Sequence, residues 1–196
     1  MQKLVTFFLY GLIFFLASCN SNERTGLVEK QSEDATSIFP VTDFLKGQLN
    51  EIESMPVTPL KTVTINGNTD SAWVTRESVR PFVAPFLTPV IDSASMSSYF
   101  SAKSFLDQTI NAFTLTYDAN KNLPGNIKLR HWDVYIDPQR NNVQRIYLVK
   151  EKGENGVNVI TQLTWKTNKW CSIRTILQKP GSDPEVKEEK IIWDFN

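Results

Sequence analysis

Metal-binding residue types are almost missing from this chain, which contains one histidine and two cysteines among its 196 residues. A structural zinc site needs four cysteine or histidine ligands, so we expect no metal site. The phosphate-binding glycine loop, the dinucleotide-binding glycine pattern and the serine nucleophile elbow are also absent from the sequence. The sequence therefore identifies no catalytic residue and no cofactor.

An excess of positive charge is missing as well, because 21 lysine and arginine residues balance 21 aspartate and glutamate residues. The sequence also has no long block of like charge. Proteins that bind nucleic acids present a basic surface to the phosphate backbone. We therefore expect no nucleic-acid partner.

A hydrophobic run long enough to cross a membrane is not present either. The apolar segment from Leu4 to Ala17 has about 14 residues, whereas a bilayer-spanning helix needs roughly 20. Lys3 precedes this segment, and the small residues Ala17 and Ser18 follow it directly before Cys19. A positive charge, a short apolar run and a small-residue end are typical of a secretory signal peptide.

The four residues from Leu16 to Cys19 resemble the lipobox of bacterial lipoproteins. The resemblance implies that a type II signal peptidase cleaves between Ser18 and Cys19, and that Cys19 becomes lipidated. Two or more acyl chains make membrane attachment stable, so the membrane is an expected partner through this anchor. Asn20 follows the cysteine in place of the aspartate associated with inner-membrane retention. The resemblance therefore favours the outer membrane of the cell envelope over the inner membrane.

The whole chain is similar in texture to small envelope lipoproteins of Bacteroidetes-type bacteria, a group with no agreed activity. The similarity runs from the lipobox through Ile65-Asn66-Gly67 to Ile192-Trp193-Asp194, and it implies no catalytic residue. Such bacteria glycosylate exported proteins at short Asp-Ser/Thr-small patterns, which occur here around Ser71 and Ser93. Glycosylation of these two serines is therefore a hypothesis.

The chain divides into three parts after these assignments. Residues 1–18 are the expected signal peptide, and their removal leaves 178 residues, enough for one domain. Residues 19–37 are rich in Asn, Ser, Glu and Thr with little apolar content, which predicts a flexible tether carrying the lipid. Residues 38–196 should form one domain. Cys171 then has no disulfide partner within the chain, and we interpret it as a small buried hydrophobic residue.

Helical patterns are concentrated in the first half of the expected domain. Apolar residues between Val41 and Ile52 recur at helical spacing, and Met55-Pro56 should end that helix. A hairpin is expected around Asn66-Gly67, followed by a short or kinked helix over 79–87 and another short helix over 92–100.

The second half of the domain has the alternating pattern of β-strands. Short turns separate the strands, which favours antiparallel pairing. The sequence thus predicts an α+β fold, with N-terminal helices packed on a C-terminal antiparallel β-meander of about six strands. The expected strands cover 112–117, 127–136, 143–150, 157–167, 170–178 and 186–195.

The single histidine, His131, stands two residues before Asp133 in one of these strands. Strand alternation places His131, Asp133 and Tyr135 on one face. A functional interpretation makes Asp133 the orienting partner of a general base. Residues two apart on a strand are only diagonal neighbours, and the sequence offers no nucleophile motif, so a solvated polar face is the simpler interpretation.

Five tryptophans are present, and large aromatic rings in a sheet backed by helices usually fill the core. Exposed rings can instead bind sugars or a protein partner. Trp132 is the candidate for such a surface, because Arg130 lies two residues away and should share its face.

Three functional hypotheses remain open from the sequence. The first is a lipid-anchored envelope lipoprotein whose non-catalytic domain binds a protein or glycan of the envelope. The second is a carrier of a ligand or glycan, with an apolar pocket between the sheet and the helices. The third is an enzyme with a site near His131 and Asp133.

Overall fold

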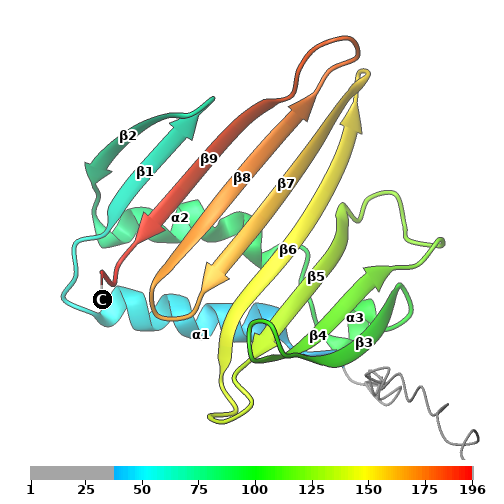
Figure 1. The fold of residues 1–196 in the computed structure, drawn as a ribbon, viewed down its shortest axis with the longest axis horizontal. Helices are drawn as coiled ribbons and strands as arrows, with labels where there is room; N and C mark the ends of the chain where they lie inside the picture. Colours follow the sequence, from blue (N-terminus) through cyan, green and yellow to red (C-terminus); the bar gives the residue numbers. More distant parts are fainter. Residues whose placement is uncertain (1–37, 196) are drawn as a thin grey trace, which may run out of the picture.

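The computed structural model describes residues 38–195, and one continuous antiparallel sheet of nine strands dominates this part of the chain (Figure 1). In chain order the strands are β1 (Leu60–Ile65), β2 (Asn68–Trp73), β3 (Phe100–Asp107), β4 (Ala112–Ala119), β5 (Leu129–Ile136), β6 (Val143–Glu154), β7 (Val157–Lys166), β8 (Trp170–Gln178) and β9 (Glu185–Ile192).

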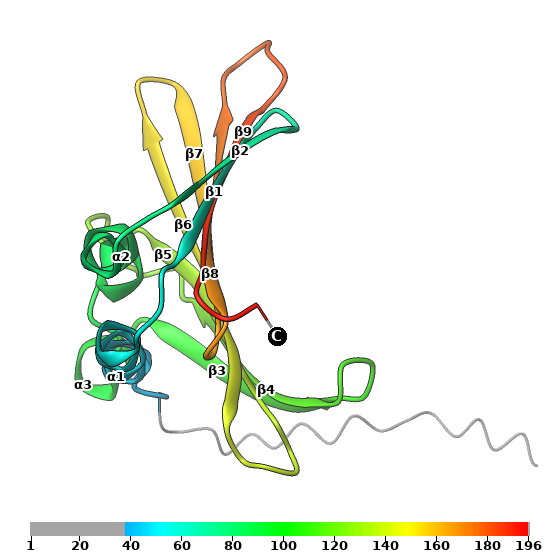
Figure 2. The same ribbon diagram turned by 90° about the vertical axis from the view of Figure 1, so that its left-hand side faces the viewer.

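The helices all lie on one face of this sheet, as the edge-on view in Figure 2 shows. Within residues 38–195, only α1 is longer than five residues. The other helical elements are single turns that follow one another between β2 and β3. The helical elements are α1 (Val41–Ser54), the 3₁₀ turn η1 (Arg76–Ser78), α2 (Val79–Val83), the 3₁₀ turn η2 (Ala84–Leu87) and α3 (Ser93–Met96).

The strand order is β2-β1-β9-β8-β7-β6-β5-β4-β3. Strands β3 to β9 therefore form a meander in which each strand pairs with its neighbours in the sequence. The β1–β2 hairpin extends this meander, because β1 pairs with β9 and places Leu60 opposite Ile192. The first and last strands of the domain thus lie side by side in one sheet.

The predicted fold class is wrong. The structure is a β-rich fold built on one large nine-stranded sheet, and not a set of helices packed on a meander of about six strands. The expected hairpin forms, but it joins the main sheet through a pairing between residues more than a hundred positions apart. The segment from Phe100 to Asp107 adds a further strand at the opposite edge.

The helical content is small for a local reason. Pro81 and Pro85 lack the backbone N–H group that continues a helix, so the segment from 76 to 87 breaks into η1, α2 and η2. The prediction for the first helix is confirmed, since α1 ends at Ser54 and Met55 is already extended before Pro56.

The core lies between the helices and the sheet. Helix α1 buries Val41, Leu45, Leu49 and Ile52 against it. From the sheet side, Trp132 and Trp165 are fully buried, and the ring of Phe86 packs edge-on against Trp165 at 5.6 Å. Bulky apolar side chains therefore occupy the space between the two layers.

Several sequence predictions lie outside the described residues. These are the signal peptide, the cleavage position between Ser18 and Cys19, the lipidation of Cys19 and the tether up to residue 37. Among residues 38–195, no helix is both long enough and apolar enough to cross a membrane.

Candidate functional site

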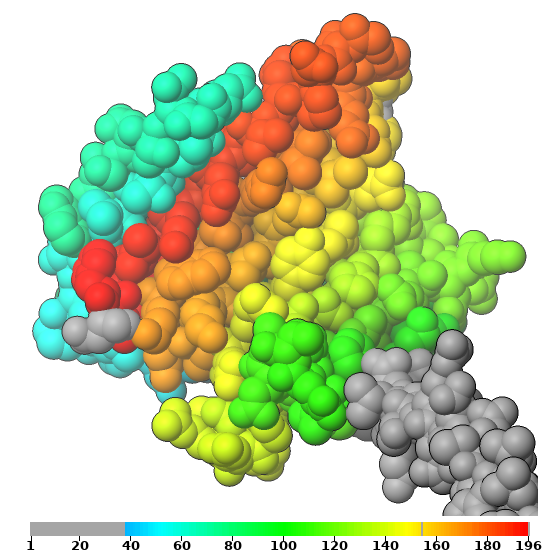
Figure 3. Space-filling model, viewed as in Figure 1, coloured from blue at the N-terminus to red at the C-terminus, as the bar shows by residue number. Residues whose placement is uncertain are grey.

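Among residues 38–195, no helix lies across the face of the sheet opposite the helices, and we call it the open face. Figure 3 views this face, whose surface is formed by the strands from β1 and β2 at one side to β4 at the other. Strand alternation sends every second side chain to it. Two cross-strand rows of largely polar and aromatic residues run across it, near the end of β7 and the start of β8: Thr116, Asp133, Tyr147, Thr164, Ser172 and Lys190, and Thr114, Tyr135, Arg145, Lys166 and Trp170.

His131 lies at the centre of a hydrogen-bonded cluster on the open face. Its Nδ1 is 2.8 Å from Oδ1 of Asp118, and its Nε2 is 3.0 Å from Oδ2 of Asp133. A neutral imidazole has only one N–H to donate, so two carboxylate partners require the doubly protonated ring. The hydrogen bond to Asp133, opposed by burial and supported by Asp118, raises the pKa of His131 to about 9. His131 is therefore a cation at neutral pH.

Asp133 holds this cluster together. Its carboxylate accepts hydrogen bonds from the Thr116 hydroxyl at 2.7 Å, from His131 and from the Tyr135 hydroxyl at 3.1 Å. Burial works against its charged form, but the hydrogen bonds from His131 and Thr116 outweigh burial and lower the pKa of Asp133. The side chain of Asp133 is only 12 % exposed, so its hydrogen bonds fix three neighbouring side chains in place.

This arrangement does not suit acid–base catalysis. A general base works best with a pKa near the operating pH and with a free nitrogen, whereas both ring nitrogens of His131 face carboxylates. The Tyr135 hydroxyl donates to Asp133, and burial, followed by the negative charge of Asp133, raises its pKa. His131 and Asp133 share one face, as strand alternation predicted, but they do not form a merely solvated polar face: they are in direct contact within a charged hydrogen-bonded cluster.

The predicted surface of Arg130 and Trp132 does not form. Trp132 is fully buried and stacks on Tyr117, with the ring centroids 4.6 Å apart. The β5–β6 pairing shifts register between Leu129 and His131, and this β-bulge removes Arg130 from the alternation that we assumed. Trp132 is therefore a core residue, and Arg130 makes its contacts elsewhere.

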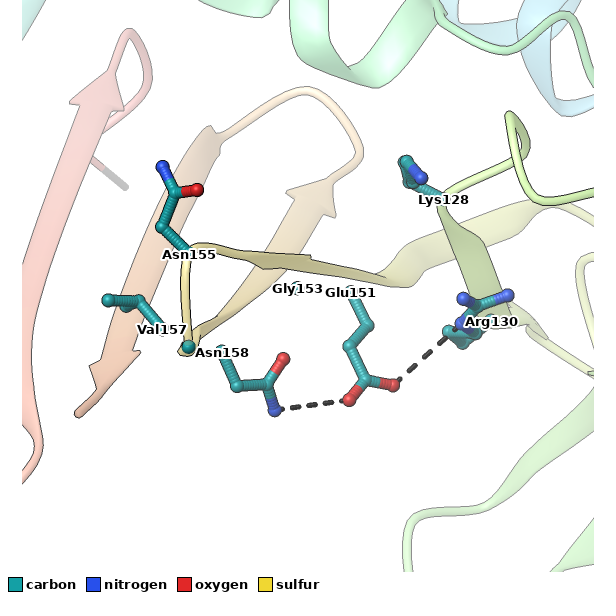
Figure 4. Close-up of a pocket in the computed structure, with 8 residues that line it drawn as sticks. Lys128, Arg130, Glu151, Gly153, Asn155, Val157 and Asn158 are labelled. Carbon is teal, nitrogen blue, oxygen red and sulfur yellow. Dashed lines mark hydrogen bonds and ion pairs between the residues drawn. The ribbon is translucent and has the colours of Figure 1, made fainter. Parts of the chain in front are cut away.

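Arg130 lines an open groove of about 590 Å³ beside the distal half of β6 (Figure 4). Strand β6 continues to Glu154, while its neighbour β5 begins only at Leu129, so the β6–β7 hairpin projects beyond β5. Glu151 connects the two sides of the groove. Its carboxylate lies 3.7 Å from Nε of Arg130 and accepts a 3.1 Å hydrogen bond from the Asn158 amide.

Three open-face residues were missed by the sequence prediction. Arg145 stacks on the ring of Tyr135 at 3.9 Å, Lys166 is the register partner of Arg145, and Trp170 follows in the same row. Lys190 covers the Trp170 ring with its ammonium group 4.2 Å from the centroid. Alternation within the predicted strand places Arg145 and Ile146 on opposite faces of the sheet. This alternation was the sequence signal that could have identified the row containing Arg145, Lys166 and Trp170.

The remaining sequence candidates fall in different places. Cys171 is buried, as predicted, and burial raises the pKa of its thiol. Ser71 is exposed on the edge strand β2, whereas the Ser93 hydroxyl donates to the Ile38 carbonyl at 3.2 Å. Trp73 is 64 % exposed and contacts Phe195 edge-on.

The described residues contain no group of three or more His, Cys, Asp or Glu side chains placed to hold a metal ion. No protein-family model matches the chain, and no curated protein sequence is similar enough to count as a relative.

Proposed function

We propose that the protein is a lipid-anchored envelope lipoprotein whose folded domain binds a component of the envelope, a protein or a glycan, without acting on it chemically. The binding surface in this proposal is the open face. The observation that carries it is the contrast between the two faces of the sheet, since helices cover one and ordered polar and aromatic side chains form the other.

The composition of the open face supports binding. Tyr135, Tyr147 and Trp170 are only half-buried there, and Arg145 lies between them in the sheet. Tyrosine, tryptophan and arginine are the residue types enriched at protein interfaces. Their rings can also stack on sugars, so both a protein and a glycan fit this surface.

The state of His131 supports a non-catalytic role. It is the only histidine of the chain, and its ring is held between two carboxylates as a cation. A locked imidazolium contributes charge and rigidity to a surface, whereas it offers no lone pair to accept a proton.

The carrier hypothesis required an apolar pocket between the sheet and the helices. That space holds fully buried side chains, among them Trp132, Trp165, Tyr117 and Phe86. We therefore place binding on the open face and not in the interior.

Site-specific cross-linking in the native membrane tests this proposal. A photoreactive residue is placed at Gln162 or Thr164 on the open face, and at the exposed Asn50 of α1 as the matched control on the helical side. We expect envelope material to be captured from positions 162 and 164 but not from 50. Capture from position 50 alone, or recovery of the bait with only a small molecule, would contradict binding of an envelope component through the open face.

A further inference from the structure

Two cations face each other on the open face, where β7 ends and close to the start of β6. Arg145 of β6 is the direct register partner of Lys166 of β7, and both line a small cavity of about 200 Å³ together with Tyr135, Gln144 and Ile110. Like charges directly opposite each other in antiparallel strands are destabilising. The pair therefore lowers the stability of the fold unless something else neutralises it.

The described part of the chain supplies no direct ion pair to either cation. Asp107 interacts with Arg145 only at longer range. The pKa of Asp107 is lowered chiefly by two hydrogen bonds from Thr109, one from its hydroxyl at 2.6 Å and one from its backbone N–H at 2.9 Å. The charge of Arg145 makes the smallest contribution to this lowering. The positive charge at this cavity is thus left largely uncompensated.

The guanidinium of Arg145 is held in a defined position. Its Cζ atom lies over the ring of Tyr135, 3.9 Å from the centroid, and the hydroxyl of Tyr135 is fixed in turn by its hydrogen bond to Asp133. The Nε atom of Arg145 is buried and has no hydrogen-bond acceptor among residues 38–195. A buried donor without an acceptor costs free energy, so the site has donor capacity that the protein does not use.

Lys166 is affected by the same surroundings. Burial, followed by the positive charges of Arg145 and Lys169, lowers the pKa of its ammonium group. A negative charge in the cavity would raise the pKa of Lys166 again. It would stabilise the charged ammonium group against burial and offset the repulsion from Arg145 and Lys169.

We propose that Arg145 and Lys166 form an anion subsite of the open face, which binds a carboxylate or phosphate group of the ligand. This inference rests on the proposed function, since it names the chemistry that the open face recognises. The planar guanidinium can donate two parallel hydrogen bonds to such a group, and the lysine adds a point charge. The cavity admits an acidic headgroup, while the aromatic residues around it contact the rest of the ligand.

Calorimetric titration of the intact mature protein in non-ionic detergent tests the subsite. The probes are inorganic phosphate and acetate, with chloride keeping the ionic strength constant. We expect saturable binding of at least one probe, and a loss of affinity of about tenfold or more in Arg145→Gln and in Lys166→Met, because each removes a charge-assisted hydrogen bond. Arg174→Gln is the matched control, since Arg174 is exposed on β8 outside the cavity.

The stability of the variants separates a lost site from a lost fold. Lys166→Met removes one of two opposed like charges, so its thermal midpoint should equal or exceed that of the wild type. Unchanged folding with lost anion binding supports the subsite. The subsite is overturned if neither probe binds saturably, or if Arg174→Gln weakens binding as much as the two cavity variants do.

Two larger probes identify the source of the acidic group. Glycerol phosphate represents a phospholipid headgroup and glucuronate an acidic sugar, and tighter binding of either supports the subsite. Cross-links from position 164 without any anion binding would overturn the subsite and leave the proposed function standing. If position 164 gives no cross-links and no anion binds, the proposed function is overturned as well.

Discussion

Replacing His131 by glutamine is expected to destabilise the protein strongly in mild acid and little in base. The folded structure raises the pKa of this imidazole from 6.5 to about 9, and its side chain is 28 % exposed. Each pKa unit corresponds to about 1.4 kcal/mol. The charged ring therefore contributes about 3 kcal/mol to the free energy of unfolding when it is fully protonated in both states.

The sign of the pH dependence follows from where the proton is bound. Below pH 6.5 both the folded and unfolded chains hold the proton, and the full contribution is present. Between pH 6.5 and 9 only the folded chain holds it, so this contribution falls by about 1.4 kcal/mol per pH unit. Above pH 9 it is gone.

Urea unfolding of wild type and His131→Gln at pH 6.0, 7.5 and 9.5, followed by tryptophan fluorescence, measures this directly. The difference between the two proteins is the informative quantity, because other groups titrate in the same range. Lys150 is one of them, since burial lowers its pKa to about 8 and gives a slope of opposite sign above that pH. Subtraction removes this contribution.

Proton NMR provides an independent measurement of the same pKa. The chain has a single histidine, so an untagged protein gives one titrating imidazole signal. A midpoint near 9 agrees with the paired carboxylates. A midpoint at or below 6.5, or a stability difference that does not change with pH, would refute the assignment of His131 as a structural cation.

Further outcomes follow from other parts of the molecule. Cys19→Ser should abolish acylation and release the protein from membranes, as intact-mass analysis and fractionation would show; a wild-type product that still begins at Met1 would contradict the anchor. Trp132→Ala should lower the free energy of unfolding in urea by about 3–5 kcal/mol, because it leaves a cavity in the core. Trp170→Ala on the open face should lower it much less, and equal losses would contradict the placement of the two rings. The stability difference between the wild type and Lys150→Met should grow in favour of the wild type as the pH rises from 8 to 10.5. The reason is that Lys150 loses its proton at lower pH in the folded chain than in the unfolded chain. A stability difference that stays constant over this range would argue against the burial of Lys150.

Local patterns predicted the local elements. The helix α1 has a regular apolar stripe and a proline after its end, and strands β4 to β9 alternate between faces and are separated by short turns. The pairing of β1 with β9 has no local signal, because it joins residues more than a hundred positions apart. Strand β3 was missed because Phe100–Asp107 lies at an edge, and its burial does not alternate regularly.

The error at Trp132 has a different physical cause. The alternation that places Trp132 with Val134 was correct, and both are fully buried. The charge of Arg130 suggested that their shared face was exposed, but the bulge between Leu129 and His131 breaks the alternation at that residue. A bulge is set by the pairing of two strands, so the sequence of one strand does not reveal it. The contact between His131 and Asp118 similarly depends on the register of β4 and β5.

The charged side chains of the open face stand on central strands of the sheet, and this position determines how the face should bind its ligand. His131, Arg145 and Lys166 lie on β5, β6 and β7, each of which has a hydrogen-bonded neighbour on both sides. Side chains on paired strands are held more firmly than side chains on loops, and the hydrogen bonds of Asp133 extend this order to Tyr135 and so to Arg145. An ordered surface loses less conformational entropy on binding. We therefore expect amide hydrogen exchange in β5–β7 to stay unchanged when a ligand binds, and a large change there would mean that the open face must rearrange to bind.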